Sequence, residues 1–175
     1  MTRLAIVAGN PKPNSRTLHV AETVAAEITR RHGTAIEQVV IDLSDFGSHM
    51  FDPFNEDLAD VVRKVVTSQL LIVASPTFKA TYTGLLKAFF DRFSNDALNG
   101  AAAVPVMVGA TPEHALAPEL FLRPLLVELG ATVPTRSFFI SEASLGRVEE
   151  LVRSWAEVVY PLIARALESP TTVQS

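Results

Sequence analysis

The sequence contains no cysteine among its 175 residues. This absence excludes disulfide scaffolds, thiolate zinc sites, CxxC redox chemistry and cysteine nucleophiles together. It fits a protein of the reducing cytoplasm, which is the location that we expect. No GxSxG motif is present either, so the chain lacks a hydrolase nucleophile elbow.

Charge and long apolar runs are also scarce. Charged residues make up 19% of the chain, the net charge is -4, and the lysines and arginines are scattered. Duplex binding needs a concentrated basic face, so we expect no nucleic-acid partner. The longest apolar run, 101–110, is interrupted by Pro105 and is far shorter than the ~20 residues of a membrane span. The apolar run 4–8 is too short for a signal peptide, so we expect neither a leader nor a membrane segment.

What the sequence does have is an apolar fraction of 48%, enough for a single large core. A chain of this length buries roughly 70% of the surface that its unfolded form exposes. We therefore expect one domain over residues 1–168. The polar end 169–175, which contains Pro170, is expected to be a disordered tail.

Short apolar runs alternate with segments of helical spacing. The runs expected to be strands are 4–8, 36–43, 70–74, 103–110 and 133–140, and the segments expected to be helices are 15–32, 56–68, 84–96, 113–129 and 144–168. This alternation predicts an α/β three-layer sandwich with a five-stranded parallel sheet and right-handed crossovers. A Rossmann half and the flavodoxin-like strand order 2-1-3-4-5 both fit it.

Three prolines complicate the pattern. Proline is disfavoured inside a central strand, so we expect Pro105 at the beginning of its strand or at a bulge. Pro118 and Pro124 predict a late start or a kink in the helix 113–129.

In open parallel sheets ligands bind beyond the carboxyl ends of the strands. The loop after the first strand offers the Ser15 and Thr17 hydroxyls, the Arg16 guanidinium and the free N–H groups of a helix start, all suited to a phosphate. A solvated loop with Ser15 as an N-cap fits the same residues equally well.

Two further loops lie at neighbouring strand ends. The segment 75–84 combines two aromatic rings with three threonines, which suits a planar ligand, although a turn capped by Thr81 or Thr83 is an equal alternative. Gly109 permits close backbone approach, and Thr111 could cap the following helix. Together the loops favour a mononucleotide such as FMN, because the GxGxxG glycines of a dinucleotide site are absent.

The segments 11–17 and 75–87 carry a family resemblance. Phe78, Gly84, Lys87 and Asp91 correspond to the Pro-x-Tyr/Phe-x-x-Ser/Thr-x-x-x-Gly-x-x-Lys motif of the NADPH-dependent FMN reductases of flavodoxin-like fold and to the Asp that follows it, with one residue fewer between Thr81 and Gly84 than in the motif. Over roughly residues 3–140 the chain resembles this family, and most closely the members that supply reduced FMN to two-component alkanesulfonate and related monooxygenases.

The resemblance implies FMN as cofactor and a role for each loop. The residues implied to bind FMN are Asn10, Pro11, Ser15, Arg16 and Thr17 at the phosphate, Pro76, Thr77, Phe78 and Lys79 at the isoalloxazine ring, and Gly109, Ala110 and Thr111 at its pyrimidine side. Two positions depart from the family. Ala110 stands where a second glycine is common, and Phe78 stands where tyrosine is common, so it stacks without donating a hydrogen bond.

The implied reaction is hydride transfer from NADPH or NADH to flavin N5, after which reduced flavin serves a partner monooxygenase or another acceptor. This chemistry needs no protein acid or base, so no catalytic residue is predicted. An NAD(P)H:quinone or azo reductase and a flavodoxin-like electron carrier are alternatives, as is a flavin-free Rossmann protein whose Asp42 binds a ribose. Lys12, Arg16 and the modest net charge favour the enzyme over the carrier.

No metal site is predicted, because no histidine pair has ligand spacing and the acids between 42 and 60 fit a solvated face. Relatives of this kind are commonly dimers or tetramers. We expect a homodimer or homotetramer, with the segment 52–57 as an interface hypothesis.

Overall fold

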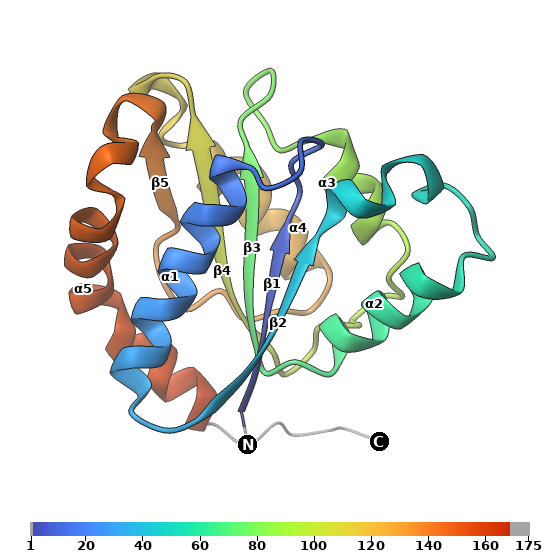
Figure 1. Cartoon of the computed structure of the whole chain (residues 1–175). Helices are drawn as coiled ribbons and strands as arrows, with labels where there is room; N and C mark the ends of the chain where they lie inside the picture. Colours follow the sequence, from blue (N-terminus) through green and yellow to red (C-terminus); the bar gives the residue numbers. More distant parts are fainter. Residues whose placement is uncertain (1, 169–175) are drawn as a thin grey trace.

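Five parallel strands form one sheet in the order β2-β1-β3-β4-β5 (Figure 1). The strands are β1 (Thr2–Ala8), β2 (Ile36–Asp42), β3 (Leu70–Pro76), β4 (Ala102–Gly109) and β5 (Phe138–Ser141). This order confirms the flavodoxin-like arrangement. The computed structural model describes residues 2–168, so the expected tail 169–175 lies outside the described residues.

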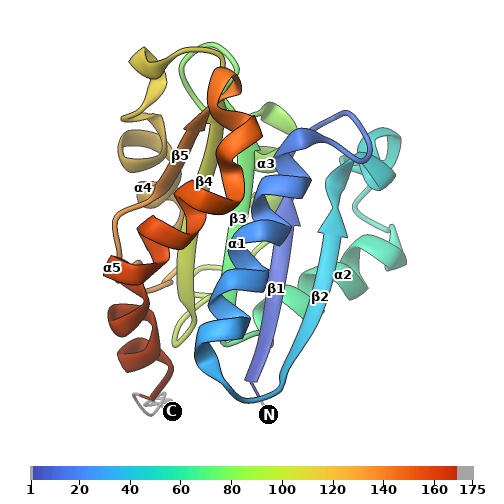
Figure 2. The same cartoon turned by 60° about the vertical axis from the view of Figure 1, so that its left-hand side comes forward.

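Helices cover both faces of the sheet. The α-helices are α1 (Arg16–His32), α2 (Glu56–Val66), α3 (Gly84–Phe90), α4 (Arg123–Glu128) and α5 (Val148–Glu168), and the shorter turns are η1 (Leu43–His49), η2 (Pro112–His114), η3 (Pro118–Leu122) and η4 (Glu142–Arg147). Helices α1 and α5 lie on one face, and α2, α3 and α4 lie on the other (Figures 1 and 2). Between residues 2 and 168 no helix is both long and apolar enough to cross a lipid bilayer.

The alternation of side chains along each strand divides the core in two. Along β3, Leu70 and Ile72 pack toward α1 and α5, whereas Leu71 and Val73 pack toward α2 and α3. All four are 0% exposed, as expected for a parallel strand that is apolar on both faces. The two buried layers hold the strand ends, and the loops that follow them, in fixed positions.

Pro105 lies inside β4, in register with Val73, so the expectation of a strand start or a bulge was wrong. The N–H of Ala103 bonds to the carbonyl of Thr132, so this position and Pro105 face the side of β5. Pairing with β5 begins only at Val106. The N–H that proline lacks would therefore have had no strand partner.

The segment 113–129 forms three pieces instead of one helix. It contains the 3₁₀ turn η2, the π-helix η3 and then α4. Pro118 and Pro124 each stand in the first turn of a piece, where a missing N–H breaks no helical bond. Of the two expectations from these prolines, a late start or a kink, the late start is confirmed, because beyond the short turn η2 the helical run begins only near Pro118. The strand expected at 133–140 is shorter and begins at Phe138.

Candidate functional site

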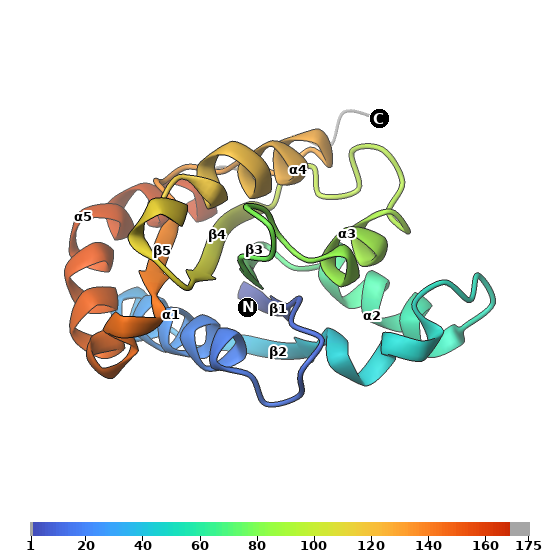
Figure 3. The same ribbon diagram turned by 90° about the horizontal axis from the view of Figure 1, so that it is seen from above.

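Three loops follow β1, β3 and β4, which are neighbours in the sheet, so the loops share its carboxyl edge (Figure 3). All the residues predicted to bind FMN belong to these loops or to the ends of the adjoining elements. Pro76 is the exception to the expected loop boundaries, because β3 runs two residues further than predicted and Pro76 is its buried last residue.

The first loop is braced from within. The Asn10 side chain donates from Nδ2 to Thr17 Oγ1 at 3.1 Å and accepts from the backbone N–H of Lys12 at 2.9 Å. Asn14 has a left-handed backbone with φ of 49°, and its N–H donates to Asp42 Oδ2 at 3.2 Å. These bonds tie the first loop together and join it to the end of β2.

The start of α1 presents unpartnered hydrogen-bond donors. Ser15 is the N-cap, and its Oγ accepts the N–H of Leu18 at 3.2 Å. The hydroxyls of Ser15 and Thr17 act only as acceptors here, so each can still donate its hydrogen. Among the described residues, the backbone N–H groups of Arg16 and Thr17 have no partner. This donor set fits a phosphate group.

Arg16 is placed differently from the other first-loop residues. Its Nη2 forms an ion pair with Glu142 Oε1 at 2.9 Å, and both side chains are largely exposed. No sequence pattern predicts the contact with Glu142, because this residue lies 126 positions from Arg16 and belongs to η4 beyond β5.

The second loop is a tight hairpin. Phe78 and Thr81 form an antiparallel bridge, and the two residues between them, Lys79 and Ala80, have φ values of 51° and 72°. Two consecutive left-handed residues are typical of a type I′ turn, which normally selects asparagine or glycine. The hairpin leaves the Phe78 ring 51% exposed, as a ligand-stacking ring would be.

At the base of this hairpin one polar atom is left unmatched. Thr77 Oγ1 is buried and has no hydrogen-bond partner within residues 2–168, although the Thr77 N–H donates to the Val108 carbonyl at 2.7 Å. A buried hydroxyl without a partner is unfavourable unless a ligand or water satisfies it. Thr83 is the N-cap of α3, which confirms one of the two capping alternatives.

The third loop begins at Gly109, whose missing side chain makes room for protein atoms. A Cβ at this position would lie 2.7 Å from the Phe139 ring and 3.0 Å from His114 Cβ. Thr111 stands at the N-cap position of η2 without bonding to the backbone of the turn. Its hydroxyl instead lowers the pKa of the Glu113 carboxyl by hydrogen bonding to it.

Both oxygens of the Asp42 carboxylate accept a backbone N–H group. Oδ1 accepts the N–H of Ser44 at 3.1 Å and Oδ2 accepts the N–H of Asn14 at 3.2 Å. Asp42 therefore ties the first loop to β2. Residues 2–168 contain no cluster of three or more His, Asp or Glu side chains that could hold a metal ion.

The geometry fits FMN in the chemistry of its donors: free N–H groups and hydroxyls for a phosphate at α1, and an exposed ring beside an unmatched hydroxyl for a flat heterocycle at β3. Comparison with known proteins gives the same answer. Residues 2–144 match the family model of the NADPH-dependent FMN reductases.

Individual relatives agree. The chain is 31% identical to the NADH-dependent FMN reductase SfnF of Pseudomonas putida, over 70% of this chain and 68% of that protein. It is 30% identical to an FMN reductase (NADPH) of Pseudomonas aeruginosa, over 80% and 76%. A crystal structure of the NADH:FMN oxidoreductase EMOB in its apo form superposes with a TM-score of 0.84 and 29% identity, covering 98% of this chain and 94% of that one.

Proposed function

Because this chain belongs to the NADPH-dependent FMN reductase family, we propose that it reduces FMN with NADH or NADPH at the carboxyl edge of its sheet. The observation that carries the proposal is the start of α1. Its unpartnered N–H groups and available hydroxyls lie on the same edge as the exposed Phe78 ring. Phosphate and ring subsites on one sheet edge are what a mononucleotide requires.

Each loop has a proposed part. Ser15, Arg16 and Thr17 bind the phosphate. Asn10, which bonds to Thr17, and Pro11 lie beside them. The ring is bound by Pro76, Thr77, Phe78 and Lys79, and its pyrimidine side by Gly109, Ala110 and Thr111. When bound, the flavin accepts hydride from the nicotinamide, so the chemistry belongs to the cofactor and no residue is assigned as an acid or base. The protein's task is to stack the rings and exclude water.

Release of reduced flavin to a partner monooxygenase is the proposed use of the reaction. It is supported by the openness of the site, since Phe78 is half exposed and Arg16 is held by an exposed ion pair. The relatives include an NADH-dependent reductase and an NADPH-dependent one, so the preferred nucleotide of this protein is to be measured. The absence of cysteine supports a cytoplasmic location.

A homo-oligomer is proposed from the segment 50–55. Phe51 and Phe54 are 85% and 87% exposed, and beside them lies a hollow lined by Pro53, Ala59, Val62, Arg63 and Arg92. Exposed aromatic rings beside a hollow that is lined by apolar side chains and two arginines allow two copies to fit each other around a two-fold axis.

The test of the oligomer is the solution mass by light scattering. Replacing Phe51 and Phe54 together by serine should give monomers, whereas Val158→Ser, at a 64% exposed position on α5, should not. A double variant that keeps the wild-type mass would refute this interface.

The test of the activity is an anaerobic FMN titration followed by addition of NADPH or NADH. Loss of the visible absorbance of oxidised flavin within seconds supports the reductase, and the faster nucleotide identifies the donor. Binding without reduction would instead indicate an electron carrier. An absence of FMN binding would refute the proposed site.

The electron acceptor is tested separately. A quinone or azo dye that consumes electrons faster than free FMN would favour the quinone or azo reductase alternative.

A further inference from the structure

Arg16 is the one charged side chain in the first turn of α1, where the flavin phosphate is proposed to bind. In the structure its guanidinium already has a charged partner outside the first loop. Nη2 contacts Glu142 Oε1 at 2.9 Å, which joins the start of α1 to the start of η4. Figure 2 shows these two elements at the same end of the molecule.

We infer that Glu142 competes with the flavin phosphate for Arg16 and thereby weakens the binding of phosphorylated flavin. This inference rests on the proposed function and assigns a specificity-determining residue to it. Glu142 lies outside the three loops that supply the binding residues, so its effect is exerted through Arg16 and through its own negative charge.

The first argument is electrostatic. A carboxylate that contacts Arg16 lies within one Debye length of any anion bound by the same guanidinium, and two anions at that range repel each other. The second argument is exposure. The side chains of Arg16 and Glu142 are 65% and 45% exposed, so the ion pair contributes little to stability and exchanges readily with another anion.

The other hydrogen-bond donors proposed for the phosphate do not depend on Arg16. Ser15, Thr17 and the first N–H groups of α1 are fixed by the helix and remain available whatever Arg16 does. Lys12 has no ion pair among the described residues, so it also remains available. Glu142 therefore modulates one of several phosphate contacts. It makes FMN exchangeable without preventing its binding, as suits a reductase that releases its flavin.

The experiment measures dissociation constants of FMN and riboflavin for wild type, Glu142→Gln, Arg16→Ala and the double variant. Removing the carboxylate should tighten FMN binding about two- to fivefold, the range of an exposed ion pair. Riboflavin, which lacks the phosphate, should bind unchanged. Arg16→Ala should weaken FMN binding, and Glu142→Gln should add no more than a small further change in that background. The tightening should shrink at high salt.

Glu37→Gln is the matched control. Glu37 also pairs with an arginine, at 3.2 Å, and its side chain is 41% exposed, but it lies on β2 near the opposite edge of the sheet. It removes the same charge and should leave FMN affinity unchanged.

Three results would overturn the inference: an unchanged or weakened FMN affinity in Glu142→Gln, an equal shift for riboflavin, or an equal shift in Glu37→Gln. Tightening of NADPH relative to NADH with unchanged FMN would show that Arg16 serves the nucleotide 2′-phosphate instead, and would overturn it too. A wild-type protein that fails to bind FMN would refute the proposed function itself, which the other outcomes do not.

Discussion

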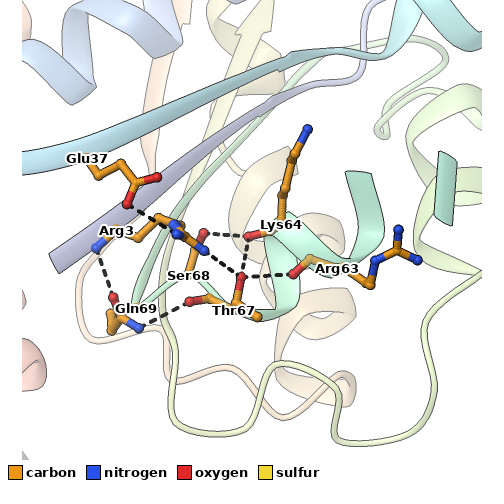
Figure 4. A network of polar contacts seen from close by, with 7 residues as sticks. All are labelled: Arg3, Glu37, Arg63, Lys64, Thr67, Ser68 and Gln69. Atoms are coloured by element: carbon orange, nitrogen blue, oxygen red, sulfur yellow. Dashed lines mark hydrogen bonds and ion pairs between the residues drawn. The ribbon is translucent and has the colours of Figure 1, made fainter. Parts of the chain in front are cut away.

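At the amino edge of the sheet a side-chain network around Arg3 bonds a turn to the strands, whereas the carboxyl edge holds most of the backbone strain. Of the five buried side-chain atoms without a hydrogen-bond partner in the described residues, Ser44 Oγ, Thr77 Oγ1 and His114 Nδ1 lie at the carboxyl edge, and Arg3 Nε and Ser137 Oγ lie toward the amino edge. Arg3 donates to Thr67 Oγ1 at 3.0 Å and to Glu37 at 3.2 Å, and its N–H donates to Gln69 Oε1 at 2.8 Å (Figure 4). This network fixes the turn from α2 to β3 against β1. Its role is structural.

The carboxyl edge differs in kind. Of the four non-glycine residues with positive φ in the described chain, Asn14, Lys79 and Ala80 lie there. The buried, unpartnered Thr77 hydroxyl lies there as well. Backbone strain and unmet hydrogen bonds persist where the surrounding fold over-determines them, and such places are commonly binding sites. The residues at the amino edge thus stabilise the fold, and the residues proposed to bind flavin lie at the carboxyl edge.

The largest effect is expected where the carboxyl edge depends on packing. A Cβ at Gly9 would lie 2.5 Å from Leu86 Cβ, which α3 holds in place. Gly9→Ala should therefore lower the free energy of unfolding by about 3 kcal/mol, the upper part of the usual overpacking cost. Urea unfolding measures it. Gly47→Ala, with nothing within 4 Å, is the control and should stay near wild type. Equal stability of the two variants would show that the first loop moves away freely.

The next largest change in stability is expected at Glu27, in the half of α1 nearer the amino edge of the sheet, and it depends on pH. Glu27 on α1 accepts hydrogen bonds from Arg30 and Arg31, and its side chain is 11% exposed. The hydrogen bonds from Arg30, with those from Arg31, lower its pKa from 4.5 to about 2. A carboxyl with a lowered pKa adds stability above the unfolded value, and that stability is lost as pH falls from 4.5 toward 2.

Glu27→Gln should accordingly cost about 2 kcal/mol of unfolding free energy at pH 7, less than the full pKa shift because the site is only partly shielded from water. The difference from wild type should shrink as the pH of the unfolding experiments is lowered through 4.5. Flavin affinity should not change. A loss that is the same at every pH would mean that packing, not charge, is at work.

The expectations that held for the fold depend on local periodicity. A helix was expected over 15–32, and in the structure Ser15 and Gly33 cap α1, because a side-chain acceptor and a left-handed glycine act within one turn. The order of the strands followed from the alternation of strands and helices. The three helical pieces within 113–129 could not be predicted from periodicity, since the choice among 3₁₀, π and α turns depends on contacts with other parts of the fold.

In the site, the sequence identified the loops but not their mutual contacts. The bond from Asn14 to Asp42 and the ion pair from Arg16 to Glu142 join residues 28 and 126 positions apart, and no local pattern encodes them. Asp42 was noticed for its place at a strand end and was given a ribose as one alternative. Its carboxylate in fact braces the first loop.

Ser15→Ala tests two roles of one side chain, because Ser15 caps α1 and is also proposed to bind the flavin phosphate. Loss of the N-cap should cost about 1 kcal/mol of unfolding free energy. Loss of the hydroxyl donor should also weaken FMN but not riboflavin. Isothermal titration of both flavins measures the second effect.

Arg3→Ala is the counterpart from the opposite edge. It removes the bonds to Thr67 and Glu37 and should also cost about 1 kcal/mol, the net value of such hydrogen bonds. It should leave both flavin affinities unchanged. If Arg3→Ala weakened FMN as much as Ser15→Ala does, the loss of affinity would follow from stability alone and the distinction between the edges would fail.

The smallest effect is expected from the strain in the hairpin. Ala80 has φ of 72°, a conformation that costs an alanine roughly 1–2 kcal/mol and a glycine almost nothing. The freer unfolded chain of a glycine variant offsets roughly 0.5–1 kcal/mol of that relief. Ala80→Gly should therefore raise the free energy of unfolding by about 0.5 kcal/mol. Ala80→Val, with a β-branched side chain in the same conformation, should lower it. Thermal unfolding of the pair resolves the sign. A destabilised glycine variant would show that the left-handed turn is not under strain. The carboxyl edge would then lose its clearest difference from the amino edge, since a buried unpartnered atom, Arg3 Nε, lies at the amino edge as well.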